Sequence, residues 1–470
     1  MRNFLISCSI LSALSAVHAA TIDGVSLSTD VAGLVTVTYS LDEDAIVTAD
    51  VRTNGVSIGG CRQWSLAGDV HRAVTAGEGK KIVWNPKADI PETTLENVTV
   101  ELKAWAKSDA PDYMVADLLK VSDCRIRYYT SVDFLPGGIV SNEQYRMYYV
   151  PFRKIPSKGV EWTMGTTSEL GRSTDGRETA HKVTLDYNYY IAVFETTKAQ
   201  VEAVGSTMNG DCTHAKTYRW RLTPAGRSPW NAWRGTMPPA DPSETSILGR
   251  FSSRTGLKID LPLESQWEFA ARGGYGEGTW GDGSAIRAKA GTDANLTRLA
   301  IYKSNIAAMT ETGTCEPNGY GLYDMHGNIF EYCRDWYQPD ITALNGALCV
   351  HPDDSTLRAD GIPGTNRVCR GGYFSYNPDQ VRASYRASEN PGYFKTEKGA
   401  RLMTLADLGE EVEPSVAVSE IAIAWIDTHA VQPAAALSAS PVALRTSHVL
   451  FSDAFPLDTL TPYGLMFILR

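Results

Sequence analysis

The chain has 470 residues, of which 43% are hydrophobic and 21% are charged, and its formal net charge at pH 7 is −10. This balance is typical of a globular protein with two or three domains. The acidic charge, without clustered lysine and arginine, argues against nucleic acid as a partner and fits poorly with an anionic membrane surface.

Residues 1–20 have the pattern of a cleavable secretory signal. Arg2 precedes an apolar run from Phe4 to Val17, and small side chains follow at Ala19 and Ala20. This order predicts export to the periplasm, the cell surface or the extracellular space. No later stretch is long and uncharged enough to predict a membrane span.

Residues 21–110 alternate apolar and polar side chains in short runs, as in Gly33–Leu41, Ala45–Thr53 and Val98–Trp105. A period of two, interrupted by turn-rich pieces, is typical of half-buried strands. About seven such runs predict a small antiparallel β-sandwich of the fibronectin or immunoglobulin kind.

The remaining chain divides into three parts by composition. Residues 111–148 form an aromatic-containing connecting region, and residues 149–405 form the main domain, with helices expected at 200–208 and 264–274. Residues 406–470 begin as an acidic linker that ends in proline and continue as a tail with an apolar end.

Eight cysteines are present, and Cys8 lies within the predicted signal. Four of the other seven lie between Cys315 and Cys369, and no pair has the C-x-x-C spacing of a zinc knuckle or a thioredoxin-like site. Because export permits disulfides, we expect one or two structural bridges in that group, with a connectivity that the sequence leaves open.

Several ordered motifs occupy the main domain. They are FETTKAQVEAV (Phe194–Val204), LPLESQWEFAARGG (Leu261–Gly274), NGYGLYDMHGNIFEYCRDWY (Asn318–Tyr337), RGGYFSYNPDQVRASYR (Arg370–Arg386) and GARL (Gly399–Leu402). In this order they resemble the sulfatase-modifying-factor, or formylglycine-generating-enzyme, family. The resemblance implies an α+β, loop-rich fold of the C-type-lectin-like kind.

Enzymes of that family oxidise a substrate cysteine by means of a copper-binding cysteine pair that follows the RGG turn. Counted from Arg370, the two positions fall on Tyr376 and Val381 in this chain. Soft Cu(I) takes sulfur ligands, which phenol and isopropyl groups do not supply. The resemblance therefore implies the scaffold of the family without its copper chemistry.

The motif DMHGNIFE carries hard oxygen ligands on an irregular backbone, a combination that suits calcium. By resemblance, calcium would be bound by the side chains of Asp324 and Glu331 and by the carbonyls of Gly327 and Ile329. The alternative is that these carboxylates cap turns and pair with Arg334 or other cations.

A second calcium loop of the family resembles DANL. It implies Asn295 and the Leu296 carbonyl as ligands, although the later aspartate of that loop has no clear counterpart here.

Other polar residues of the motifs are better explained by structure than by catalysis. His326 has no catalytic partner in the pattern. Glu264 and Glu268 lie four apart on one helical face, where one can meet Arg272 and the other can cap the helix. We expect Arg370 and Arg401 to hold turns and buried carboxylates.

Two functions remain open. The first is an exported, calcium-stabilised, non-oxidase binding module that presents Tyr373, Tyr376 and Arg382 to a peptide or glycan, since aromatic rings stack on such ligands and guanidinium groups bind anions. The second is a formylglycine-generating oxidase that acts on a sulfatase. A thiol pair formed by Cys369 with Cys349 or Cys333 would favour the second.

Overall fold

The computed structural model describes residues 20–91, 95–120, 125–206, 221–276, 278–350 and 364–405. Most of the predicted signal and the whole of the predicted linker and tail at 406–470 lie outside these ranges. Among the described helices, none has the length and apolar character needed to cross a bilayer.

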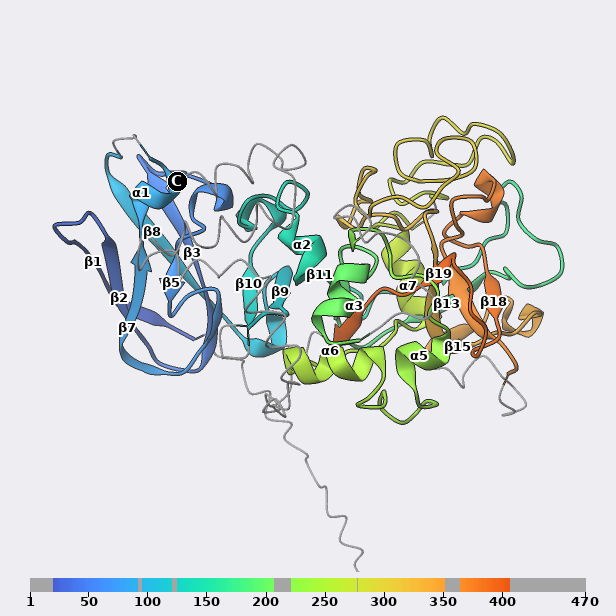
Figure 1. Cartoon of the computed structure of the whole chain (residues 1–470), viewed down its shortest axis with the longest axis horizontal. Helices are drawn as coiled ribbons and strands as arrows, with labels where there is room; N and C mark the ends of the chain where they lie inside the picture. The colour runs from blue at the N-terminus through green and yellow to red at the C-terminus, as the bar shows by residue number, and fades with distance from the viewer. Residues whose placement is uncertain are drawn as a thin grey trace, which may run out of the picture.

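Two antiparallel sheets form the N-terminal part (Figure 1). The first has the order β1-β2-β7-β5, with bounds Ile22–Thr29, Val35–Leu41, Gly77–Trp84 and Ala67–Gly68. In the second, β3 (Ala45–Thr53) pairs with β4 (Val56–Ser57), β6 (Arg72–Val74) and β8 (Val98–Trp105), and a short helix, α1 (Pro86–Asp89), lies outside both sheets. Alternate residues of β2 are buried, as its period of two predicts. Val37, Val47 and Trp84 have no exposed surface and belong to the core between the sheets.

A five-stranded sheet begins the main domain, in the order β10-β9-β11-β14-β20. Its strands are Ile126–Tyr129, Tyr113–Asp117, Tyr149–Ile155, Tyr189–Ala192 and Met403–Leu405. The strands β9 and β10 come from the predicted connecting region, but they complete the same sheet as the main domain. All five residues of β9 are buried, so this run lacks the alternation by which a strand is recognised in a sequence.

Two smaller sheets complete the domain. One has the order β12-β13-β16 (Trp162–Met164, His181–Thr184, Leu348–Val350), and the other has the order β18-β17-β15-β19 (Ala387–Glu389, Arg367–Arg370, Phe330–Trp336, Lys398–Gly399). The described helices are short: α2 (Gln144–Met147), α3 (Lys198–Ala203), α5 (Trp230–Arg234), α6 (Ile247–Thr255) and α7 (Glu264–Ala271). Long loops connect these elements (Figure 1), in agreement with the loop-rich α+β expectation.

Both predicted helices are present, with different lengths. The first is α3, which begins after Thr197, where the Thr197 and Gln200 side chains form a reciprocal capping box. It ends at Ala203, and the expected end at residue 208 lies outside the described ranges. The second is α7, and Gly273 and Gly274, with φ of 63° and 88°, follow its end as the glycine pair predicted.

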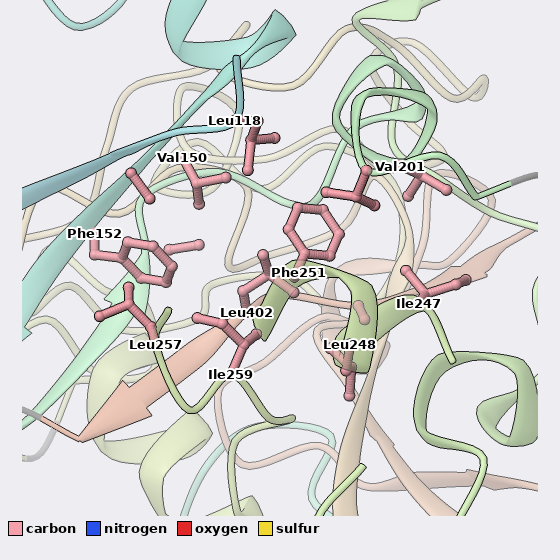
Figure 2. Packing of buried hydrophobic residues seen from close by; sticks show 14 of the residues in the cluster. Leu118, Val150, Phe152, Val201, Ile247, Leu248, Phe251, Leu257, Ile259 and Leu402 are labelled. Carbon is pink, nitrogen blue, oxygen red and sulfur yellow. The ribbon is translucent and has the colours of Figure 1, made fainter. Parts of the chain in front are cut away.

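The largest apolar core joins the five-stranded sheet to α6 (Figure 2). Phe152 of β11, Leu248 and Phe251 of α6, and Leu402 just before β20 have at most 1% of their surface exposed. Burial of side chains of this size contributes about 2 kcal/mol each. This core therefore holds the C-terminal motif against the first strands of the domain.

His71 connects the sandwich to the main domain. Its backbone N–H donates to Val47 O at 2.6 Å, while its own carbonyl accepts from Tyr128 N at 2.8 Å. Its Nδ1 atom lies 3.0 Å from Tyr128 O. The imidazole ring stacks on the ring of Tyr129, and the two ring centroids are 4.8 Å apart. Burial, together with the charge of Arg127, lowers the pKa of His71 to about 4.

The buried His71 makes stability depend on pH. The unfolded chain takes up a proton near pH 6.5 and the folded chain only near pH 4, so the free energy of unfolding falls as the pH drops through this window. We expect His71→Asn, whose amide can donate to Tyr128 O at a positive φ, to remove roughly 2–3 kcal/mol of that fall. Urea unfolding of both proteins at pH 7.5 and pH 4.5 measures the difference, and equal pH slopes would contradict the prediction.

Candidate functional site

Buried ion pairs position the motif loops around α7. The Glu264 carboxylate accepts hydrogen bonds from Arg386 at 2.6 and 2.8 Å and lies 3.0 Å from Nε of Arg370. Glu268 accepts from Arg272 at 2.6 Å and also pairs with Arg370. Glu268 meets Arg272 as expected, whereas Glu264 pairs with Arg386 and Arg370 in place of the expected cap, and Arg370 holds buried carboxylates.

Arg382 has no exposed surface. Its guanidinium donates to Glu178 at 2.9 and 3.0 Å and to Glu169 at 3.0 Å, and it also bonds the Ser384 hydroxyl. These contacts fix the loop between Tyr376 and Tyr385. Contact between Arg382 and a ligand stays a prediction, and the contacts in the structure give Arg382 a positioning role in the loop that carries Tyr376 and Tyr385.

Aromatic side chains gather beside this loop, and we call Tyr373, Phe374, Tyr376 and Tyr385 the tyrosine cluster. The ring centroids of Tyr373 and Tyr376 are 4.3 Å apart, and those of Tyr376 and Tyr385 are 6.1 Å apart. Phe330 lies against both Tyr373 and Tyr376, at 5.7 and 5.3 Å. All four cluster members are half-buried, so each has both a packed and an accessible part. Partial burial raises the pKa of Tyr385 to about 12, so the phenol stays a neutral hydrogen-bonding group.

A short loop bonded to Phe330 carries two exposed aromatic side chains. Phe330 N donates to Glu397 O at 2.9 Å, which ties residues 391–397 to the ring beneath the tyrosine cluster. Within this loop Tyr393 and Phe394 are 61% and 58% exposed. Exposed neighbouring aromatic side chains are typical of surfaces that bind a partner.

A group of buried carboxylates surrounds Arg401. Glu331 accepts from Arg401 at 2.6 and 3.0 Å and from the Trp267 indole at 2.6 Å. Asp324 accepts from the Thr312 hydroxyl at 2.8 Å and from Gly313 N at 2.6 Å through Oδ2, while its buried Oδ1 has no hydrogen-bond partner.

Glu195, which the motif reading did not single out, completes this group. It accepts from Asn328 Nδ2 at 2.7 Å and from Ile329 N at 3.2 Å, and it has no exposed surface. Burial, followed by the charges of Asp324 and Glu331, raises its pKa well above the usual range. Burial also raises the pKa of Asp324. Three carboxylates thus face one guanidinium.

The predicted calcium ligands of this loop fit the ion only in part. Asp324 offers an unpaired buried oxygen, but both oxygens of Glu331 are engaged by Arg401. Gly327 has φ of 85°, and a Cβ there would lie 2.0 Å from Ile301 O, so a glycine is required at this turn beside Ile329. Within the described ranges, no group of three or more His, Cys, Asp and Glu side chains is arranged to hold a metal.

The second predicted calcium loop is built around Asp293. Its carboxylate accepts from the backbone N–H groups of Asn295 and Leu296 at 3.0 and 3.2 Å. The Asn295 amide donates to Ala285 O at 2.8 Å, and the Leu296 carbonyl accepts from Leu299 N at 2.8 Å. Internal hydrogen bonds therefore account for the form of this loop, and a calcium role for Asn295 and Leu296 stays a prediction.

His326 is buried, and both of its ring nitrogens make hydrogen bonds to the backbone. Its Nε2 accepts from Gly281 N at 3.0 Å, which leaves Nδ1 to donate to Val381 O at 2.9 Å. Burial lowers its pKa to about 4, so the ring is neutral at pH 7.

The expected disulfides are wrong for the four clustered cysteines, because Cys315, Cys333, Cys349 and Cys369 are all free thiols. Cys369 packs in the core beneath the tyrosine cluster, whereas Cys333 and Cys349 belong to a second core. Cys333 follows Tyr332, the partner of Cys369 in the β15–β17 pair, so the two thiols point to opposite faces of the sheet.

Comparison with known proteins identifies the family. The sulfatase-modifying factor enzyme 1-like domain matches residues 155–406. Formylglycine-generating enzyme from Mus musculus is 26% identical over 294 residues, which cover 53% of this chain and 74% of the relative. The chain therefore belongs to the sulfatase-modifying factor enzyme 1-like family.

Other relatives match over shorter segments. Serine/threonine-protein kinase pkn1 from Chlamydia pneumoniae is 33% identical over 141 residues, so the match spans 30% of this chain and only 20% of that relative. The protein named inactive C-alpha-formylglycine-generating enzyme 2 from Mus musculus is 32% identical over 105 residues, covering 20% of this chain and 33% of the relative.

The buried pair of Arg401 and Glu331 tests whether the main domain depends on its buried ion pairs, which we call the ion-pair frame. We expect Arg401→Met to lower the free energy of unfolding by about 3–5 kcal/mol, because it leaves a buried carboxylate without its cation. The control is Arg298→Met, whose side chain is 48% exposed in its ion pairs and whose loss should cost less than about 1 kcal/mol. Chemical denaturation of both variants measures the two values, and similar losses would contradict the prediction.

Proposed function

We propose that the chain is an exported, calcium-stabilised binding module without oxidase activity, and that its tyrosine cluster binds a peptide or glycan. The observation that carries the proposal is the group of half-buried rings, which pack against one another and against Phe330 and lie on a loop that Arg382 fixes through Asp379. Rings fixed in this way lose little conformational freedom on binding, and their accessible faces suit stacking on sugar rings or peptide side chains.

The positions of the thiols support a non-oxidase function. Tyr376 belongs to the tyrosine cluster, and Val381 is fully buried in an apolar core with Trp280 and Tyr302. Neither side chain is a ligand for Cu(I). The thiol of Cys369 lies in a different core from those of Cys333 and Cys349, so the thiol pairs that would favour copper binding are not formed.

A formylglycine-generating oxidase that acts on a sulfatase is the second candidate. It is favoured by the family match and by the relatives named formylglycine-generating enzyme. One relative, 32% identical over 105 residues, is named inactive C-alpha-formylglycine-generating enzyme 2. The two candidates share the aromatic surface as the place of contact, and they differ in whether a bound cysteine is oxidised there.

Calcium is the cofactor that the carboxylate group supports best. The unpaired Asp324 Oδ1 and the excess of three carboxylates over one guanidinium both favour a cation. Because Glu331 is held by Arg401, we assign Asp324 the larger part in binding, with the Gly327 and Ile329 carbonyls beside it. The ion would neutralise buried charge and lock the loop.

Export is proposed from the signal pattern of residues 1–20. The first strand, β1, begins at Ile22, directly after the predicted cleavage point. Thr21 N donates to Asp42 Oδ1 at 2.6 Å, a contact that a new ammonium terminus at this position would strengthen.

Removal of one ring tests the binding surface. We expect Tyr376→Ala to weaken binding about tenfold, which corresponds to the loss of one stacking contact of about 1.4 kcal/mol. The variant should remain folded, because Tyr376 lies at the margin of the core and only part of its ring is packed. Binding is measured by screening the full chain against glycan and peptide arrays, followed by calorimetry with the best probe.

Tyr275→Ala is the matched control, since Tyr275 is 48% exposed and lies outside the tyrosine cluster. Unchanged binding by Tyr376→Ala, or equal weakening by both variants, would contradict the assignment. Incubation with Cu(I) and a Cys-x-Pro-x-Arg peptide tests the second candidate, and conversion of the thiol to an aldehyde would replace the proposed function by the oxidase.

Addition of calcium tests the cofactor. We expect about 1 mM calcium, in the range of extracellular sites, to raise the melting temperature above that measured in chelator. Asp324→Asn should abolish this response while retaining stability in chelator, because the substitution removes one of three crowded carboxylate charges. Equal responses of wild type and variant, or an equal response to magnesium, would contradict a calcium site at Asp324.

A further inference from the structure

Cys369 and Lys398 form a buried pair of reactive groups that neither the ion-pair frame nor the proposed ligand surface uses. The Lys398 Nζ lies 3.7 Å from the Cys369 Sγ. Cys369 has no exposed surface and Lys398 is 5% exposed. The two residues belong to β17 and β19, the strands on either side of β15.

The surroundings hold the amine in this position. Nζ lies 3.3 Å from a Glu389 carboxylate oxygen, 3.5 Å from Ser388 O and 4.8 Å from the centre of the Phe330 ring. Glu389 can accept the proton that an ammonium group must lose before its nitrogen reacts. In the same part of the core, the hydroxyl of Tyr332, the β-sheet partner of Cys369, is buried without a hydrogen-bond partner.

We propose that Cys369 and Lys398 are a redox-modification site at which dioxygen joins the two side chains through one bridging oxygen atom. Sulfur and nitrogen are already close enough that a small side-chain shift accommodates that atom between them. Dioxygen is small and apolar, so it can enter a core that excludes charged oxidants.

The reaction is balanced with dioxygen as the only co-reactant. Neutral thiol and neutral amine lose one hydrogen each, the O–O bond breaks, and S–O and O–N bonds form. The second oxygen atom leaves as water with the two hydrogens. Sulfur and nitrogen each give up two electrons, and dioxygen takes up all four.

The thiol stays protonated in the reduced protein. Burial raises the pKa of Cys369 to about 12, although the charge of Lys398 opposes this shift. The thiol therefore reacts in its protonated form, and we expect the bridge to form slowly in air rather than in a rapid thiolate reaction.

The bridge would tie β17 to β19 across β15. Tyr373, Tyr376 and Tyr385 pack against the core that contains Cys369, so the covalent link would lie directly beneath the tyrosine cluster. It would also close a loop between residues 29 positions apart, which restricts the unfolded chain. The oxidised protein should therefore melt at a higher temperature than the reduced protein.

The test is intact-mass measurement and peptide mapping of the full chain, kept under air or under nitrogen. In air we expect a mass gain of one oxygen atom less two hydrogen atoms and a linked peptide that joins Cys369 to Lys398. Dithiothreitol should reverse the mass gain, the peptide link and the shift in melting temperature. Cys369→Ala and Lys398→Met should remove the linked species.

Cys333→Ala is the matched control, because Cys333 is equally buried on the adjacent strand but faces the other core. It should still form the bridge. An unchanged mass in air, a gain of whole oxygen atoms at Cys369, or a loss of two hydrogens without added oxygen would overturn the proposal. Peptide mapping of the wild-type chain decides among these outcomes even where a variant fails to fold.

Discussion

Pairing of buried arginines with carboxylates is the interaction on which the main domain depends. Its helices are short and its motif loops are long, so local hydrogen bonding holds little of the chain in place. Arg370, Arg386 and Arg401 instead join strands and loops from the C-terminal motif to Glu264, Glu268 and Glu331. Burial of such charges is costly, and it is tolerated only where the geometry satisfies both partners. The pairs therefore specify one arrangement of the loops more than they add net stability.

The buried charges of the main domain are balanced around Arg382 but not around Arg401. Arg382 faces two carboxylates, Glu169 and Glu178, and its donors are engaged. Around Arg401 there are three carboxylates, and an oxygen of Asp324 has no partner. A buried excess of negative charge must be relieved by a proton or by a cation. The raised pKa of Glu195 favours relief by a proton, and calcium at Asp324 would supply relief by a cation.

The sequence predicts what depends on short spacing. Alternation in β2, the extent of α7 and the Glu268–Arg272 pair all follow from residues within a few positions of one another. Long-range partners were not predictable, because Arg382 meets Glu169 and Glu178 at separations of 213 and 204 residues. Likewise β9 has no polar alternation, and its place in the sheet depends on Tyr149–Ile155 rather than on its own pattern. Glu195 lies within the motif Phe194–Val204, but only folding brings it to Asp324. The cysteines are close in sequence, yet Cys333 and Cys369 face different cores, and so the expected bridges are wrong.

The frame and the aromatic surface are separate in physical terms, and this separation explains how a family fold can change its chemistry. Arg382 and Glu178 are buried and, together with Glu169, fix the loop, whereas Tyr376 and Tyr385 use only part of their surface for packing. Substitution of a partly exposed residue of the tyrosine cluster leaves the buried charges paired, so this surface can vary at little cost in stability. A substitution in the frame leaves a charge without a partner. Selection for a new ligand can therefore act on the tyrosine cluster, while the arginines and their carboxylates keep the fold.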